Sequence, residues 1–107
     1  MAAEVDIDEL ARVRDSGDIA LIDVRRRDEY EEFHVPGAVL IPLDELPDRL
    51  AELPAVSPLY IICRTGHRSG VAADFLAEQQ IEAINVAGGS LAWMKAGKAI
   101  ATGSEPS

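Results

Sequence analysis

Apolar residues follow two different spacings along the chain. Compact apolar runs bounded by polar or turn residues predict buried strands, and they cover residues 19–24, 39–41, 59–62 and 83–86. Apolar residues three and four positions apart predict helices with one buried face, and these segments are residues 7–17, 44–53, 71–80 and 88–97, with a short helical turn at 28–33. Strands that alternate with helices indicate an α/β fold, here a parallel sheet of four or five strands with helices on both faces.

Several residues mark where these elements begin and end. Asp6 followed by Glu9 forms the pattern of a capping box before the first helix, and Asp44 caps the second long helix. Pro47 falls in the first turn of that helix, where its missing N–H costs little. Residues 1–100 therefore form one domain, and the small polar residues 101–107 are expected to form a flexible C-terminal tail.

Length and composition exclude several classes of protein. The chain has 107 residues, of which 48% are hydrophobic and 27% charged, as expected for one soluble globular domain. No apolar stretch approaches the roughly 18 residues of a membrane-spanning helix, and no secretory signal precedes the first helix. We therefore expect a cytoplasmic protein. A single cysteine, Cys63, excludes an intramolecular disulfide, and one Cys with two His residues makes a Cys-rich zinc site implausible.

The charge of the chain is strongly acidic but unevenly distributed. The formal net charge is −9, which disfavours nucleic acids and anionic membrane surfaces as partners. Two of the ten cationic residues, Arg64 and Arg68, nevertheless lie directly after Cys63, with His67 between them. A local basic loop on an acidic protein indicates that this loop binds an anion.

The loop after the best predicted strand contains the candidate chemistry. It reads Cys-Arg-Thr-Gly-His-Arg-Ser from Cys63 to Ser69 and precedes a predicted helix. Open parallel sheets bind ligands at the carboxyl ends of their strands. Gly66 lets the loop curl with its N–H groups inward, and the helix offers its positive end. These features stabilise a thiolate, the nucleophilic form of cysteine. The alternative is that Cys63 is a small buried hydrophobic residue.

Three segments of the chain together resemble the rhodanese family. The segment from Cys63 is similar to the family's active-site loop, Cys-Arg-x-Gly-x-Arg. Upstream, Asp-Val-Arg from Asp23, Glu-Tyr from Glu29 and His-Val-Pro-Gly-Ala from His34 resemble a second signature of the family. Asn-Val-Ala-Gly-Gly from Asn85, followed by Trp93, resembles its closing signature. The resemblance spans about residues 5–100, and one departure is Phe33, where the family usually has Gly.

The resemblance implies a single-domain sulfurtransferase without a cofactor or a metal. Cys63 would take a sulfane sulfur from thiosulfate or another persulfide donor, hold it as a persulfide, and pass it to cyanide or a thiol. The resemblance also implies the substrate-binding residues, which are Arg64, Thr65, Gly66, His67, Arg68 and Ser69. A sulfur-accepting protein is a further expected partner, and we expect a monomer or a weak homodimer.

Two other functions compete with sulfur transfer. Cysteine phosphatases and arsenate reductases use the same kind of thiolate, and some phosphatases share the rhodanese fold. The phosphatase loop, however, has five residues between Cys and Arg, whereas only four separate Cys63 from Arg68. The shorter loop suits an added sulfur atom better than a phosphate. The second competitor is a non-catalytic interaction module, which the intact Cys63 and its arginine-rich loop argue against.

The other candidate residues favour structural roles. We interpret Asp23 and Arg25 as an ion pair or a cap in preference to residues lining the site, and His34 as a hydrogen-bonded turn residue. His67 either adds positive charge near Cys63 or points to solvent. Trp93 and Phe33 form an apolar rim for a substrate, or Trp93 belongs to the core.

Overall fold

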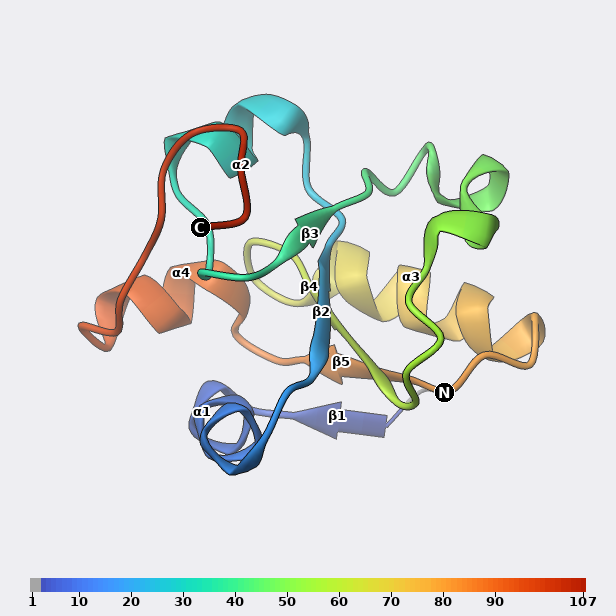
Figure 1. The fold of residues 1–107 in the computed structure, drawn as a ribbon, viewed down its shortest axis with the longest axis horizontal. Coiled ribbons are helices and arrows are strands. Elements are labelled where there is room, and N and C mark those ends of the chain that lie inside the picture. The colour runs from blue at the N-terminus through green and yellow to red at the C-terminus, as the bar shows by residue number, and fades with distance from the viewer. Residues whose placement is uncertain (1–2) are drawn as a thin grey trace.

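The computed structural model of the chain describes residues 3–107. Its strands form one five-stranded sheet (Figure 1). From edge to edge the strand order is β1-β5-β4-β2-β3. The strands are β1 (Ala3–Val5), β2 (Ala20–Asp23), β3 (Val39–Leu40), β4 (Leu59–Ile62) and β5 (Ala83–Val86). Every neighbouring pair is parallel, which confirms the α/β fold expected from the apolar runs.

Helices cover both faces of the sheet and create two cores. They are α1 (Ile7–Ser16), α2 (Arg27–Glu32), α3 (His67–Glu78) and α4 (Gly89–Lys95). Leu59 and Ile61 of β4 lie in one core with α3, whereas Tyr60 and Ile62 lie in the other with α1, α2 and α4. Both cores meet at β4, because successive strand residues face opposite sides of the sheet. Within residues 3–107, none of the helices has the length and apolar character needed to cross a membrane.

Two elements differ from the sequence-based expectation. The edge strand β1 is only three residues long and largely exposed, so it has no apolar run that would reveal it. Residues 44–53 form two short 3₁₀ turns, Leu46–Asp48 and Leu50–Glu52, in place of the expected helix. Pro47 lacks an amide donor, and Pro54 favours an extended conformation for the residue before it, so consecutive α-helical hydrogen bonds do not form.

Helix α3 begins four residues earlier than its apolar pattern suggested. The residue before it, Gly66, has a left-handed backbone conformation with φ of +106°. Glycine adopts this conformation without steric cost, so the chain turns directly from the loop after β4 into the helix. His67, Arg68 and Ser69 therefore belong to the first turn of α3 and not to an extended loop.

The last residues of the chain are hydrogen-bonded to the segment that follows α2. His34 and Ala101 form an antiparallel bridge, and Gly37 donates its N–H to the carbonyl of Pro106 at 2.9 Å. The buried ring of His34 lies 2.9 Å from the carbonyl oxygen of Glu105 through Nε2. Through these contacts residues 101–107, the expected tail, lie against the domain. The flexibility of these residues stays a prediction, but their hydrogen bonds indicate that they stabilise the fold.

Deletion of residues 101–107 is therefore expected to lower the free energy of unfolding by about 1–2 kcal/mol, because His34 and Gly37 lose their partners. Urea-induced unfolding measures this change. A chain that lacks only Ser107 is the control, since it keeps all of these hydrogen bonds. An unchanged unfolding midpoint after the full deletion would show that the tail adds no stability.

Candidate active site

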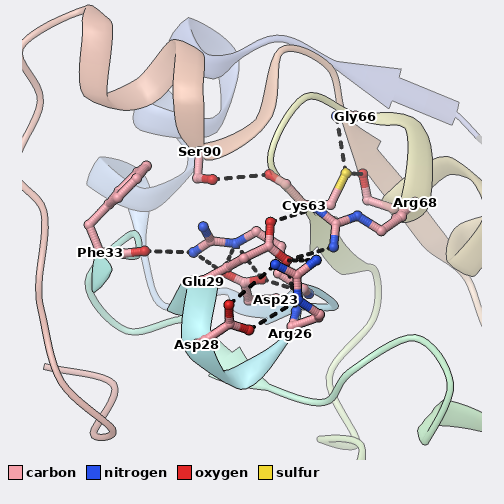
Figure 2. A network of polar contacts seen from close by, with 11 residues as sticks. Asp23, Arg26, Asp28, Glu29, Phe33, Cys63, Gly66, Arg68 and Ser90 are labelled. Carbon is pink, nitrogen blue, oxygen red and sulfur yellow. Dashed lines mark hydrogen bonds and ion pairs between the residues drawn. The ribbon is translucent and has the colours of Figure 1, made fainter. Parts of the chain in front are cut away.

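The only thiol of the chain lies at the carboxyl end of β4, a central strand. β4 ends at Ile62, and Cys63 begins the loop that leads to α3. The Cys63 residue is 1% exposed, and Figure 2 shows its sulfur facing Gly66 and the start of α3. The strand order puts Cys63 between the ends of β2 and β5, as expected for a site at the carboxyl edge of a parallel sheet.

The first turn of α4 holds the backbone of this loop in place. Ser90 donates to the carbonyl oxygen of Cys63 through both its backbone N–H, at 2.9 Å, and its hydroxyl, at 3.2 Å. The amide of Leu91 donates to the carbonyl of Arg64 at 3.0 Å. A Cβ atom on Gly89 would lie 2.4 Å from each of these carbonyl oxygens. Only glycine therefore permits this close contact.

The loop supplies hydrogen-bond donors to the cysteine sulfur. The amide of Gly66 donates to Cys63 Sγ at 3.1 Å, and the hydroxyl of Ser69 lies 3.2 Å from the same atom. Burial opposes the charged form and is the largest single effect on this thiol. Hydrogen bonds from the Ser69 hydroxyl and from the amides of Ser69, Gly66 and Thr65 outweigh burial, so the pKa of Cys63 lies below its ordinary value.

A chain of polar side chains continues from Ser69 to the edge of the sheet. The Ser69 hydroxyl lies 2.5 Å from Oδ1 of Asn85. Asn85 in turn donates through Nδ2 to Glu4 at 2.8 Å and to the carbonyl of Gly66 at 3.1 Å. Ser69 has one hydroxyl hydrogen for two acceptors, and a thiolate on Cys63 is the stronger acceptor because it is charged.

Sequence reasoning did not find the roles of Asn85, Glu4 and Ser90. Asn85 and Ser90 belong to the closing signature or lie beside it, but their contacts with the loop depend on the pairing of β4 with β5. The Gly-Gly pair at Gly88 was the available signal, because two glycines before a helix indicate a close backbone approach.

The two arginines of the loop have different surroundings. Arg68 donates to both carboxylate oxygens of Glu29, at 2.7 Å and 2.9 Å (Figure 2). The side chain of Arg64 forms no hydrogen bond or ion pair within residues 3–107. Anion binding by both arginines stays a prediction, but in this structure only Arg64 is free of a carboxylate.

The remaining loop residues lie at the surface. Thr65 and His67 are both exposed, so neither side chain is fixed beside the buried sulfur. The side chain of His67 forms no hydrogen bond or ion pair among residues 3–107, and its exposure favours the interpretation that it faces solvent. Thr65 contributes through its backbone amide, one of the donors that lower the pKa of Cys63.

Asp23 and Arg25 form a buried ion pair, as the sequence favoured. Both side chains are 0% exposed, and Arg25 contacts the two carboxylate oxygens of Asp23 at 2.9–3.1 Å. Arg25 also donates to the carbonyl of Phe33 at 2.7 Å and lies over the Phe33 ring. Through Arg25, the pair therefore links the end of β2 to the residue that follows α2.

The aromatic residues belong to the interior. Phe33 and Trp93 are each 6% exposed, so they do not form an apolar rim. Phe33 has an extended backbone with φ of −166°, which any residue adopts. The turn therefore does not need the glycine that the family usually has there.

A groove lies beside the loop, on the side of Arg68. Its volume is about 590 Å³, and it is lined by Val24, Arg25, Arg26, Pro42, Leu43, Asp44 and Arg68. Within residues 3–107 no group of three or more His, Cys, Asp or Glu residues is arranged to hold a metal ion.

The sequence model of the Rhodanese-like domain family matches residues 6–96. The chain belongs to the rhodanese-like domain family. This agrees with the buried thiol at the end of β4, the loop and the Gly-Gly turn described above, and it confirms the resemblance drawn from the sequence. The family match covers all of the elements from α1 to α4.

Relatives of this rhodanese-like domain support sulfur transfer. A sulfurtransferase from Allochromatium vinosum is 33% identical over 99 residues, covering 91% of this chain and 92% of that protein. A putative sulfur carrier protein, YrkF from Bacillus subtilis, is 43% identical over 74 residues, covering 68% of this chain. The chain spans 40% of the length of YrkF and as little as a fifth of other relatives it matches.

Solved structures show the same fold. A rhodanese-like domain protein from Staphylococcus aureus superposes with a TM-score of 0.79 at 35% sequence identity. The match covers 85% of this chain and 90% of that one. The arrangement of sheet, loop and covering helices is therefore that of a rhodanese-like domain.

Replacement of Ser69 by Ala is expected to raise the pKa of Cys63, because it removes a hydrogen bond that favours the thiolate. The rate of Cys63 alkylation by iodoacetamide, followed against pH, should then reach its plateau at a higher pH. Ser90→Ala is the matched control, since that hydroxyl contacts the Cys63 carbonyl and not the sulfur. Equal pH profiles for Ser69→Ala and the unaltered protein would contradict the role of Ser69.

The Glu29–Arg68 ion pair also predicts a pH dependence of stability. Hydrogen bonds from Arg68 are the largest effect on Glu29 and lower its pKa from 4.5 to about 2. The pair therefore stabilises the fold fully above the unfolded-state value, and this contribution is lost as the pH falls through about 2.

Glu29→Gln should consequently lower the unfolding temperature at neutral pH and have little effect near pH 2. Thermal unfolding across this pH range measures the difference. Glu31→Gln is the control, because the Glu31 side chain forms no ion pair among the described residues. The same loss of stability at every pH would exclude ionisation of Glu29 as its cause.

Proposed function

We propose that this chain is a sulfurtransferase that holds a sulfane sulfur as a persulfide on Cys63. The observation that carries the proposal is the surroundings of Cys63 Sγ, where the Gly66 amide and the Ser69 hydroxyl lie 3.1 Å and 3.2 Å away. Donors arranged in this way stabilise a negative charge on sulfur. A persulfide needs the same stabilisation on its outer sulfur.

The first half-reaction loads the cysteine. With thiosulfate as the donor, the Cys63 thiolate attacks the outer sulfur, a new S–S bond forms, and the bond to the central sulfur breaks with its electron pair. The products are the Cys63 persulfide anion and sulfite, so atoms and charge balance. In this proposal the amides of Thr65, Gly66 and Ser69 hold the charged outer sulfur, while Arg64 attracts the anionic donor.

The second half-reaction unloads the cysteine. Cyanide or a thiolate attacks the outer sulfur of the persulfide, and the S–S bond breaks towards Cys63, which becomes a thiolate again. With cyanide the product is thiocyanate. No proton has to be transferred in either anionic step.

A protein acceptor is part of the proposal. The relative named as a putative sulfur carrier supports sulfur transfer to or through proteins. We expect the transfer to occur in the cytoplasm, with the chain acting as a monomer or weak homodimer. The net charge of −9 disfavours nucleic acids and anionic membranes as partners.

Phosphatase or arsenate reductase activity is the main alternative function. Inward-facing amides also suit a tetrahedral oxyanion. The loop, however, has only four residues between Cys63 and Arg68, and Arg68 is held by Glu29. An arginine that is free to bind the oxyanion is therefore missing at this position, which favours sulfur transfer.

Incubation with thiosulfate should add the mass of one sulfur atom to the intact protein, and cyanide should remove it. Intact-protein mass spectrometry measures both changes. Cys63→Ser should show neither, whereas Ser90→Ala keeps the thiol and should still gain sulfur. In parallel, hydrolysis of an aryl phosphate should stay at background. Phosphate release that depends on Cys63, at a rate comparable to sulfur transfer, would favour the phosphatase instead.

A further inference from the structure

The second arginine of the loop is engaged by a carboxylate from another element. Arg68 and Glu29 are 39 residues apart, and both terminal nitrogens of Arg68 contact the two Glu29 oxygens. The pair is partly shielded, since the Glu29 side chain is 11% exposed and that of Arg68 31%. A bidentate contact of this kind uses the same donor face of arginine that binds an oxyanion.

Glu29 is fixed in place independently of Arg68. The backbone N–H of Arg26 donates to Glu29 Oε1 at 3.0 Å, so the carboxylate is held at the first turn of α2. Asp28 pairs with the side chain of Arg26 at 3.0 Å. The four charged groups of this network, Arg26, Asp28, Glu29 and Arg68, therefore sum to zero (Figure 2).

The charged side chains that line the groove beside the loop are also mostly paired. Arg25, Arg26 and Arg68 all line it, but each is paired with a carboxylate, and Asp44 adds a negative charge. Val24, Pro42 and Leu43 supply apolar surface. A groove with paired cations and apolar walls suits an organic group of low charge better than a compact dianion.

The sulfur lies within electrostatic range of this ion pair. The pKa of Arg68 is raised chiefly by the hydrogen bonds to Glu29, and Cys63 makes a smaller contribution in the same direction. Because Glu29 balances the charge of Arg68, an anion that approaches the sulfur from this side meets no net positive charge from the pair.

We propose that Glu29 determines the donor preference of the site: by holding Arg68, it disfavours the thiosulfate dianion and favours the persulfide of an organic thiol. This inference rests on the proposed function. With such a donor, the Cys63 thiolate attacks the outer sulfur of the persulfide, its S–S bond breaks, and the organic thiolate leaves. Atoms and charge balance, and no oxyanion has to be bound.

Glu29→Gln tests the proposal, because the amide keeps an oxygen for the Arg26 N–H but removes the charge that holds Arg68. The value of kcat/KM for thiosulfate should rise about tenfold, as expected when one partly buried arginine becomes free to bind a dianion. The value for 2-hydroxyethyl persulfide, whose organic part is uncharged, should change by less than about twofold. Glu29→Ala should likewise raise kcat/KM for thiosulfate and leave the value for 2-hydroxyethyl persulfide nearly unchanged.

Glu31→Gln is the matched control. It removes a carboxylate of the same helix that forms no ion pair among residues 3–107 and does not line the groove, so both donors should react as with the unaltered protein. The double variant Glu29→Gln/Arg68→Met should lose the gain with thiosulfate. Persistence of the gain in the double variant would overturn the claim that Glu29 acts by withholding Arg68.

The failure of this inference can be distinguished from failure of the proposed function. If Glu29→Gln changes kcat/KM equally for both donors, or leaves thiosulfate unaffected, donor preference does not reside in Glu29, although Cys63 still forms a persulfide. If neither donor adds sulfur to Cys63 in any variant, the proposed sulfurtransferase function itself is wrong.

Discussion

The site depends on two carbonyl groups that point away from it. A loop whose N–H groups converge on one sulfur atom must turn its carbonyl oxygens outward, and a buried carbonyl without a partner is costly. The first turn of α4 provides the partners through the amides of Ser90 and Leu91, which reach the carbonyls of Cys63 and Arg64 at 2.9 Å and 3.0 Å. This contact orients the amides that face Sγ.

The same contact explains why glycine is required beside the loop. Gly89 lies so close to the loop backbone that any Cβ would overlap the carbonyl oxygens of Cys63 and Arg64 at 2.4 Å. The backbones of β5–α4 and β4–α3 therefore form one unit, and β4–β5 pairing brings them together. Burial alone would disfavour a charged sulfur. The pKa of Cys63 is lowered by donors at Thr65, Gly66 and Ser69 of its own loop, and the contact with α4 holds the backbone that carries them.

The sequence predicted those elements whose signal is local. β4 and β5 were found with their boundaries because each is an apolar run beside polar residues, and Asp6 caps α1 as its spacing with Glu9 indicates. The loop around Cys63 was recognised because it combines the single cysteine with a glycine and two arginines within six residues. Membership of the family and the parallel sheet followed from these segments.

The remaining features depend on contacts between distant residues. Arg68 was expected to bind the donor, but its ion pair with Glu29 spans 39 positions and results from the placement of α2 beside the loop. Asn85 reaches Ser69 only because β5 lies next to β4. The short strand β1 has no apolar run, and its Glu4 enters the polar chain through Asn85. Local patterns contain none of this information.

The central claim is that the loop stabilises a negative charge on Cys63 despite the burial of its sulfur. The most direct measurement is an NMR titration of the unaltered protein with ¹³C at Cβ of its single cysteine, which reports the ionisation of that thiol alone. The account predicts a midpoint clearly below the value of about 8.5 for an unperturbed cysteine. A midpoint at or above that value would show that burial outweighs the hydrogen bonds, and it would contradict the account.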